Sequence, residues 1–255
     1  MTKTRSIAND HCTRAEWQVR CELAALYRVV AHFRMTDLID THISARVPGD
    51  APHFLINRYG VLFHEMRGSD LVKIDLEGRR VDADDSDDGI NQAGFTIHSA
   101  IHAARDDVAC VIHTHTAAGI AVSAQHGGLL PISQHALKFY GRLGYHDYEG
   151  IALDLDERER LVKDLGPYMA MVLRNHGLLA VGGSIAQAFD QIYFLEHACQ
   201  AQIQAMSGGA TLRMPPEHIR VRTCRQYDTA SSDAVINLAW RSALRLIGDE
   251  SSYCC

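Results

Sequence analysis

The chain has 255 residues and a formal net charge of −6, and 47% of its residues are hydrophobic. This length allows one large domain or two small ones, and the apolar fraction is sufficient for a sizeable core. The negative charge and the lack of a basic stripe argue against a nucleic acid as partner. We find no uncharged apolar run of 18 residues and no signal-peptide pattern, so we expect no membrane partner. Seven irregularly spaced cysteines suit a reducing compartment and predict a cytoplasmic protein.

The first third of the chain predicts a polar arm, one helix and a group of strands. We expect residues 1–13 to form a flexible arm because they are polar. A helix should follow Thr13, which forms a plausible capping box with Glu16. The strands are predicted at residues 43–47, 54–57 and 71–75, and their close spacing indicates antiparallel pairing.

An acidic run at residues 82–89 separates these strands from the centre of the chain. Its spacing resembles that of a calcium loop, but its glycine and final glutamate do not fall at the required positions, so we expect a solvated loop. Apolar residues from Phe95 onward then fall on one side of a helix that ends near Arg105. His98 and His102 lie one turn apart on this helix and could bind a metal, although a structural hydrogen-bonding role is the default.

Two histidines close the apolar run at residues 108–116, whose composition is typical of a strand. Residues i and i+2 of a strand point to the same face, so His113 and His115 should project side by side. A third histidine, His176, follows another apolar run and has a glycine behind it. Three neutral imidazoles with an open position form a recognised catalytic metal site. The chain has 15 histidines, however, so the pattern alone leaves a structural role for the pair open.

The second half of the chain predicts mainly helices around the His176 strand. We expect a small-residue helix at 117–125, a loop-rich stretch at 129–148 and an amphipathic helix at 156–165. The His176 strand should end at residues 178–181 and turn at 182–183. A helix capped by Ser184 should then reach Met206. Past residue 207 the composition becomes polar, with a last helix near 233–247 and a solvent-exposed Cys254-Cys255 tail.

Several phrases of this sequence resemble the class II aldolase/adducin family, and its adducin-like head-domain branch most closely. The resemblance runs from about Glu16 to Ala205, with the motifs in the family's order and spacing. The matching phrases are Asn91-Gln92-Ala93-Gly94-Phe95-Thr96-Ile97-His98, Val111-Ile112-His113-Thr114-His115-Thr116, Gly128-Leu129-Leu130-Pro131-Ile132-Ser133, Tyr145-His146-Asp147-Tyr148 and Leu173-Arg174-Asn175-His176-Gly177-Leu178.

The resemblance implies a fold, a cofactor and an assembly. Family members are α/β proteins, three-layer α/β/α sandwiches with a largely antiparallel central sheet, and they commonly form homotetramers. We therefore expect a family domain at residues 14–207 and a C-terminal extension at 208–255 that packs on the same domain or on a neighbouring subunit. By carry-over, His113, His115 and His176 would bind a divalent metal, most often Zn²⁺, with Fe²⁺, Mn²⁺ or Co²⁺ as alternatives.

The chain departs from the family's sugar-phosphate aldolases at the substrate positions. Those enzymes carry a glutamate four residues before the histidine that matches His98, and Gly94 stands there instead. Their phosphate loop is replaced by Thr41-His42-Ile43-Ser44, which keeps only the serine, and their Ser-Ser pair by Gln92-Ala93. A non-phosphorylated small-molecule substrate is therefore expected. The substrate-binding candidates are Ser44, Gly60, Gln92, Gly94 and His98.

The general acid or base must then come from elsewhere in the chain. Tyr145 and His146 are the main candidates by resemblance and residue type, since a tyrosine can protonate a departing group and a histidine titrates near neutral pH. Tyr148, His42 and His135 are further options.

Three functions compete at this point. The first is a metal-dependent lyase, an aldolase or decarboxylase, that stabilises an enediolate or enolate of a carbonyl substrate. The second is a non-haem Fe(II) oxygenase on the same fold. The third is a non-catalytic interaction module like the adducin head. The intact trio of histidines argues against the third, and we favour the first.

Overall fold

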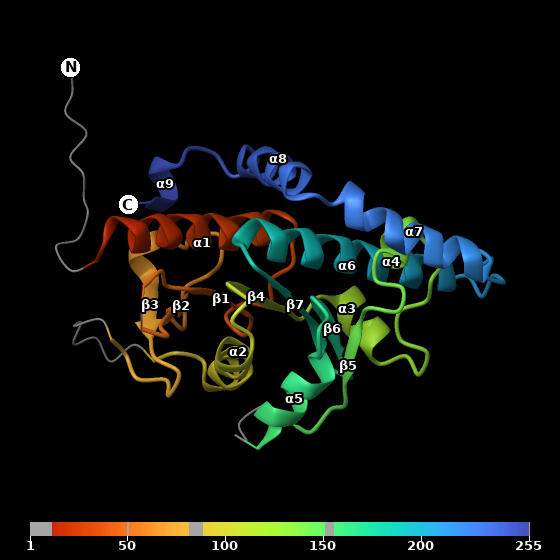
Figure 1. Ribbon diagram of the computed structural model, residues 1–255, viewed down its shortest axis with the longest axis horizontal. Coiled ribbons are helices and arrows are strands. Elements are labelled where there is room, and N and C mark those ends of the chain that lie inside the picture. The colour runs from red at the N-terminus through yellow and green to blue at the C-terminus, as the bar shows by residue number, and fades with distance from the viewer. Residues whose placement is uncertain (1–11, 50, 82–88, 151–155, 255) are drawn as a thin grey trace.

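The computed structural model describes residues 12–49, 51–81, 89–150 and 156–254 (Figure 1). The predicted arm and the acidic run fall almost wholly outside these residues. In chain order the elements are α1 (Arg14–His32), β1 (His42–Arg46), β2 (Phe54–Asn57), η1 (Gly68–Asp70), β3 (Leu71–Ile74), α2 (Gln92–Ala104), β4 (Cys110–Thr114), α3 (Ala117–Ser123), α4 (Gln134–Leu137), β5 (Gly144–His146), α5 (Glu157–Leu165), β6 (Ala170–Leu173), β7 (Gly177–Gly182), α6 (Ile185–Met206), α7 (Glu217–Ala230), α8 (Asp233–Leu244) and α9 (Ser251–Cys254).

One seven-stranded sheet organises the fold, in the order β3-β2-β1-β4-β7-β6-β5. Its strand pairs are antiparallel except β5 with β6, which are parallel. The helices α1 and α6 cover one face of the sheet, and α2 and α5 cover the other (Figure 1). The predicted three-layer α/β/α architecture with a largely antiparallel sheet is therefore confirmed.

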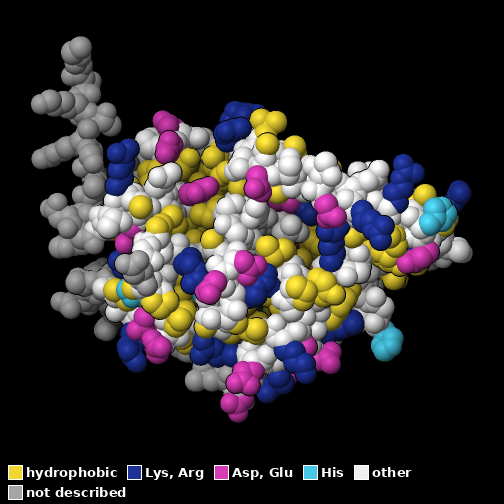
Figure 2. All heavy atoms as spheres, in the orientation of Figure 1, with side chains coloured by type: hydrophobic (Ala, Val, Ile, Leu, Met, Phe, Trp, Pro, Cys, Tyr) yellow, Lys and Arg dark blue, Asp and Glu magenta, His cyan; other side chains and the backbone are white. Residues whose placement is uncertain are grey.

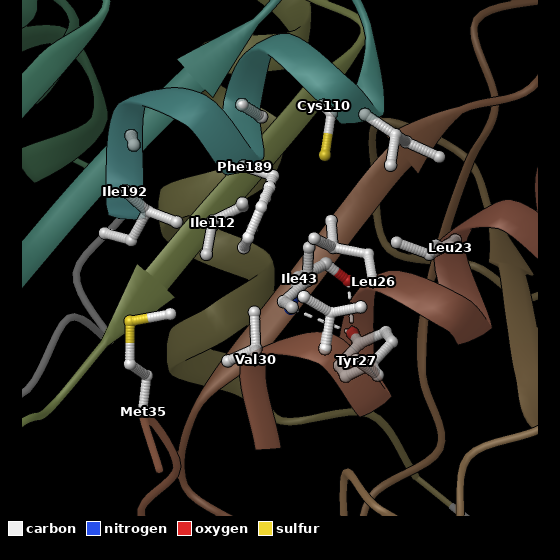
Figure 3. Close-up of a cluster of buried hydrophobic side chains, with 14 of the residues drawn as sticks. Leu23, Leu26, Tyr27, Val30, Met35, Ile43, Cys110, Ile112, Phe189 and Ile192 are labelled. Carbon is white, nitrogen blue, oxygen red and sulfur yellow. Dashed lines mark hydrogen bonds between the residues drawn. The ribbon is translucent and has the colours of Figure 1, made fainter. Parts of the chain in front are cut away.

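Side chains alternate across β4 and supply both halves of the core. Ile112 points toward α1 and α6, where it joins the large apolar cluster drawn in Figure 3. Val111 points to the other face, into a smaller cluster with Ile97 of α2 and Leu161 of α5. Consecutive residues of a strand point to opposite faces, and both faces of β4 are buried. The strand is therefore apolar at every position before His113.

The helix starts follow the predicted capping chemistry with one exception. Ser184 caps α6 by accepting a hydrogen bond from Gln187 N, and Thr13 accepts one from Glu16 N at 3.1 Å. The capping box at Thr13 is only half formed, however. The carboxylate of Glu16 is buried and accepts hydrogen bonds from Arg20 and from Lys73 of β3, which ties the start of α1 to the sheet instead.

The structure contains two strand features that the sequence did not predict. The stretch at residues 129–148, expected to be rich in loops, also contains the short strand β5, because Gly144–His146 pairs in parallel with β6. The expected single strand around His176 is a hairpin, since β6 and β7 pair antiparallel with Leu173 opposite Gly177. An apolar run does not by itself reveal where a chain reverses, which explains the hairpin. The three residues of β5 are too few to give a strand pattern in the sequence.

The C-terminal extension is more helical than its polar composition indicated. The polar stretch before the last predicted helix forms α7, which lies near α4, and α8 packs on α6 (Figure 1). Cys254 belongs to the short helix α9 and is partly buried against α1, so the prediction of a solvent-exposed tail was wrong for this residue. In the part of the chain that the structure describes, no helix combines the length and apolarity that a membrane crossing requires.

Candidate metal centre

The end of β4 presents two of the three predicted histidines to the same side of the sheet. His113 is the penultimate residue of β4, and His115 comes directly after the strand. β4 pairs with β7 so that Thr114 lies opposite Leu178. This register brings the turn between β6 and β7 beside the end of β4, and His176 lies in that turn.

Two residues of this turn have conformations that explain their identity. Asn175 adopts φ +57°, a left-handed conformation that asparagine tolerates better than most residues with a side chain. Gly177 lies so close to the carbonyl oxygen of Thr114 that a Cβ atom would collide with it. The Asn-His-Gly sequence is therefore what allows the turn to approach β4.

The three imidazoles point their Nε2 atoms at one another. The Nε2 of His113 lies 2.7 Å from that of His115 and 3.2 Å from that of His176, and the last two are 2.9 Å apart. Ligands about 2 Å from a tetrahedral zinc ion are separated by about 3.3 Å. In the described residues this is the one group of three or more potential ligands close enough to hold an ion together.

The second ring nitrogens of two of these histidines are held by oxygen acceptors. His113 Nδ1 donates to the carbonyl oxygen of Leu178 at 3.0 Å. His115 Nδ1 donates to a carboxylate oxygen of Asp37 at 3.1 Å. Such partners fix the tautomer with the proton on Nδ1 and leave Nε2 unprotonated, as metal ligation requires. Asp37 was missed in the sequence because it lies in the loop after α1, 78 residues from its partner and outside any pattern.

Burial keeps two imidazoles of the centre, those of His113 and His176, neutral. The pKa of His113 lies well below its ordinary value, mainly because the side chain is fully buried and secondarily because His176, His42 and His115 are close. Burial also lowers the pKa of His176 to about 4, with a contribution from His115. Both imidazoles are therefore unprotonated at neutral pH, the form that binds divalent metals.

A second group of buried histidines lies behind the centre. His42 Nδ1 hydrogen-bonds with His98 Nε2 at 2.8 Å, and His98 Nδ1 with the Ser44 hydroxyl at 2.6 Å. The same hydroxyl hydrogen-bonds with His102 Nε2 at 2.8 Å. Burial lowers the pKa of all three histidines, that of His102 to about 3. The group is therefore a chain of hydrogen bonds between uncharged side chains. The chain ends at His42, whose ring centroid lies 5.1 Å from that of His113.

Comparison with known proteins places this arrangement in a family. Residues 21–203 match the family model described as Class II Aldolase and Adducin N-terminal domain. The chain belongs to the class II aldolase/adducin family. An aldolase II superfamily protein from Pseudomonas syringae superposes with a TM-score of 0.89 at 51% identity, over 97% of this chain and 98% of the other.

Two further relatives are an aldolase and an adducin. An L-fuculose 1-phosphate aldolase from Glaciozyma antarctica PI12 superposes with a TM-score of 0.79 at 26% identity, over 91% of this chain and 89% of the other. Alpha-adducin of Rattus norvegicus is 47% identical over 203 residues, which cover 79% of this chain and 27% of the adducin. The matched residues are therefore about a quarter of that adducin.

The position of the family's glutamate is filled by another residue. A Cβ atom at Gly94 would lie 2.5 Å from Cδ2 and 2.8 Å from Nε2 of His42. Only glycine leaves room for this ring. The ring of His42 on β1 therefore fills the space beside position 94, where the sequence comparison expects a glutamate in the sugar-phosphate aldolases.

The two predicted acid–base residues are held by neighbouring groups. His146 Nδ1 lies 2.8 Å from a carboxylate oxygen of Asp164, and His146 Nε2 lies 3.3 Å from one of Glu157. The Tyr145 hydroxyl accepts a hydrogen bond from Leu129 N at 3.1 Å. Tyr148 has 53% of its surface exposed, and its ring centroid is 6.3 Å from that of His176. Of these three side chains, Tyr148 makes the ring contact with the trio of histidines.

The remaining candidates lie in different surroundings. Ser44 and His98 are buried and hydrogen-bonded as described, so they do not present free polar atoms to solvent. Gly60 occupies an exposed turn with φ +93°. Gln92 is the first residue of α2. Substrate binding by these residues stays a prediction.

Proposed function

We propose that this protein is a divalent-metal-dependent lyase, of the aldolase or decarboxylase type, that acts on a non-phosphorylated carbonyl substrate. The observation that carries the proposal is the convergence of the Nε2 atoms of His113, His115 and His176 at separations of 2.7 to 3.2 Å. The donor set fits a divalent ion, since two of the imidazoles are neutral at pH 7 by their lowered pKa and two donate from Nδ1 to fixed oxygens.

These three histidines would hold the ion, most often Zn²⁺ in sites of this composition. When bound, a divalent ion supplies charge that polarises a carbonyl oxygen and stabilises an enediolate or enolate. The protein's own residues orient the three imidazoles. Asp37 and the Leu178 carbonyl fix the tautomers, while the partial exposure of His115 and His176 leaves one side accessible to a substrate.

The environment of the centre supports a substrate without a phosphate group. Ser44 is the residue retained from the family's phosphate loop, and its hydroxyl is buried between His98 and His102. Position 94 carries no carboxylate, and the His42 ring fills its space. Tyr145, His146 and the exposed Tyr148 are the groups that we propose for proton transfer at the centre.

Metal content is the first test of the proposal. The protein is purified without a metal-affinity tag, and metals are measured by elemental mass spectrometry on the wild type, on His113→Ala and on the matched control His64→Ala, whose histidine is exposed. We expect about one zinc per chain in wild type and control and a loss of the metal in His113→Ala. If the protein contains iron and consumes oxygen, the Fe(II) oxygenase would replace the lyase as the proposed function.

The adducin relationship supplies a second candidate function. The 47% identity to alpha-adducin over 203 residues favours a non-catalytic interaction module. The absence of stoichiometric metal, even after incubation with zinc, iron or manganese, would overturn both the lyase and the oxygenase and leave the interaction module. With metal bound, hydroxy-ketones and β-keto acids would be screened beside their phosphorylated counterparts, and we expect turnover of the former only.

Three further proposals rest on the family resemblance and on composition. We propose a homotetramer, a cytoplasmic location, and a division between a family domain at residues 14–207 and an extension at 208–255. Light scattering coupled to size exclusion tests the first of these directly, since a monomer at micromolar concentration would contradict it.

A further inference from the structure

Both tryptophans of the chain line one cavity that lies away from the histidine centre. Trp17 of α1 and Trp240 of α8 face a hollow of about 660 Å³ between α1, α8 and α9. Small-molecule sites generally have volumes of about 300 to 1,000 Å³. Figure 2 shows hydrophobic side chains exposed in a hollow over α1, between α8 and α9, with acidic side chains at its rim.

The wall of the cavity is apolar and aromatic. Trp17, Trp240 and Tyr253 contribute rings, and Ala25 and Leu244 contribute aliphatic surface. Cys21 and Cys254 also line it, and burial raises the pKa of the Cys254 thiol well above its ordinary value. That thiol is therefore uncharged, and it adds to the apolar surface rather than acting as a nucleophile.

The charged groups of the cavity are mainly acidic. Glu22 and Glu250 line it, together with Arg14 at its N-terminal side. Glu22 Oε1 accepts a hydrogen bond from Trp240 Nε1 at 3.1 Å, and in the described part of the chain no partner is found for its other oxygen. Burial raises the pKa of Glu22, as expected for a carboxylate whose charge has not been fully compensated.

We propose that this cavity binds a small organic cation, an amine carried on an aromatic or aliphatic body. The rings of Trp17 and Trp240 line the cavity and can attract a cation, whereas the Tyr253 ring already has the Arg28 guanidinium 5.9 Å from its centroid. Glu22 offers the second oxygen of a half-buried carboxylate. The apolar wall accommodates the body of the ligand. Such a site is independent of the lyase function, because none of its lining residues belongs to the histidine centre.

Intrinsic fluorescence tests the proposal directly, since both tryptophans of the protein line the cavity. The wild type is titrated with 2-phenylethylamine, with the neutral 2-phenylethanol and with the anionic phenylacetate, and binding is verified by calorimetry. We expect a saturable change with the amine at one site per chain, and binding of the alcohol and the acid weaker by about tenfold or more. No saturable binding of the amine up to about 10 mM, or equal binding of all three probes, would overturn the proposal.

Glu22→Gln is the informative variant, because its amide oxygen can still accept the hydrogen bond from Trp240. We expect the preference for the amine over the alcohol to fall by about tenfold, while the alcohol binds as before. Glu250→Gln, at an exposed position, serves if Glu22→Gln does not fold, and a smaller loss is expected there. An unchanged preference in the folded variants would contradict the role of the carboxylates.

His113→Ala separates this proposal from the lyase proposal. The variant should bind 2-phenylethylamine as the wild type does, whether or not it has lost a metal. Loss of amine binding in His113→Ala would place the amine at the histidine centre and overturn the assignment to the cavity.

Discussion

The ring of His42 occupies the space that a side chain at position 94 would need, with its Cγ atom 2.7 Å from where a Cβ atom on Gly94 would stand. The two residues lie on different elements, β1 and α2, and 52 positions apart. Their sizes are therefore coupled: a histidine at 42 requires a glycine at 94.

This coupling predicts that Gly94→Ala is destabilising by about 1 to 3 kcal/mol, the usual cost of overpacking a filled site. The effect should shrink in the double variant His42→Ala/Gly94→Ala, because the added methyl group then has room. Urea unfolding of the four proteins in the cycle gives the coupling energy directly. Gly208→Ala, where a Cβ meets nothing within 4 Å, is the control. Equal stabilities of Gly94→Ala and wild type would show that the His42 ring moves aside at no cost.

The carboxylate of Asp37 is expected to strengthen metal binding through His115. In Asp37→Asn the amide can no longer balance the charge of the metal-bound imidazole, so metal affinity should fall by about 10- to 100-fold. Competition with a chelator of known affinity measures the change. Asp40→Asn in the same loop, whose carboxylate accepts a hydrogen bond from Tyr59 instead, should retain the wild-type affinity. A similar loss of metal affinity in both variants would show that the effect comes from the loop as a whole and not from the hydrogen bond between Asp37 and His115.

The left-handed conformation of Asn175 predicts that a glycine variant is more stable than an alanine variant at this position. Asn175→Gly should fold with unchanged or slightly higher stability, whereas Asn175→Ala should lose about 1 kcal/mol, because an alanine at φ +57° is strained. His176 follows directly, so Asn175→Ala should also weaken metal binding. Thermal unfolding of the apoproteins separates the first effect from the second. Greater stability of the alanine variant would contradict the turn geometry.

Acid should destabilise the metal-free protein through its buried histidines. The pKa of His102 is about 3 in the folded state, below the value near 6.5 of an exposed histidine, so the unfolded chain binds the proton first. Above pH 6.5 the histidine is neutral in both the folded and the unfolded state, so its protonation does not reduce the free energy of unfolding. Between pH 6.5 and 5 the loss from this one residue is about 2 kcal/mol, and it continues until the pH reaches the folded pKa.

Urea unfolding at pH 7, 6 and 5 in the presence of a chelator checks this direction. In His102→Gln, whose amide can still hydrogen-bond to Ser44, the decrease in stability toward low pH should be smaller. An identical pH dependence in wild type and variant would assign the acid sensitivity to other groups.

Local sequence determined much of this fold. The apolar run that ends in His113 and His115 identified a strand and placed both imidazoles on one side, since a period of two needs no tertiary information. The caps at Thr13 and Ser184 marked the starts of α1 and α6, because a hydroxyl there satisfies a nearby backbone N–H within the same turn. The glycine at position 94 was visible as a departure, but the sequence did not show what fills its space.

Tertiary structure alone decided how the centre is assembled. His176 is placed by a hairpin whose reversal at Asn175 cannot be seen in an apolar run, and Asp37 reaches His115 across 78 residues of chain. The His42 ring meets Gly94 only because β1 pairs with β4 and α2 covers that face of the sheet. Periodicity and capping act within a few residues and can be read from the sequence. Distances between remote side chains depend on strand register and on helix packing, which no local pattern specifies.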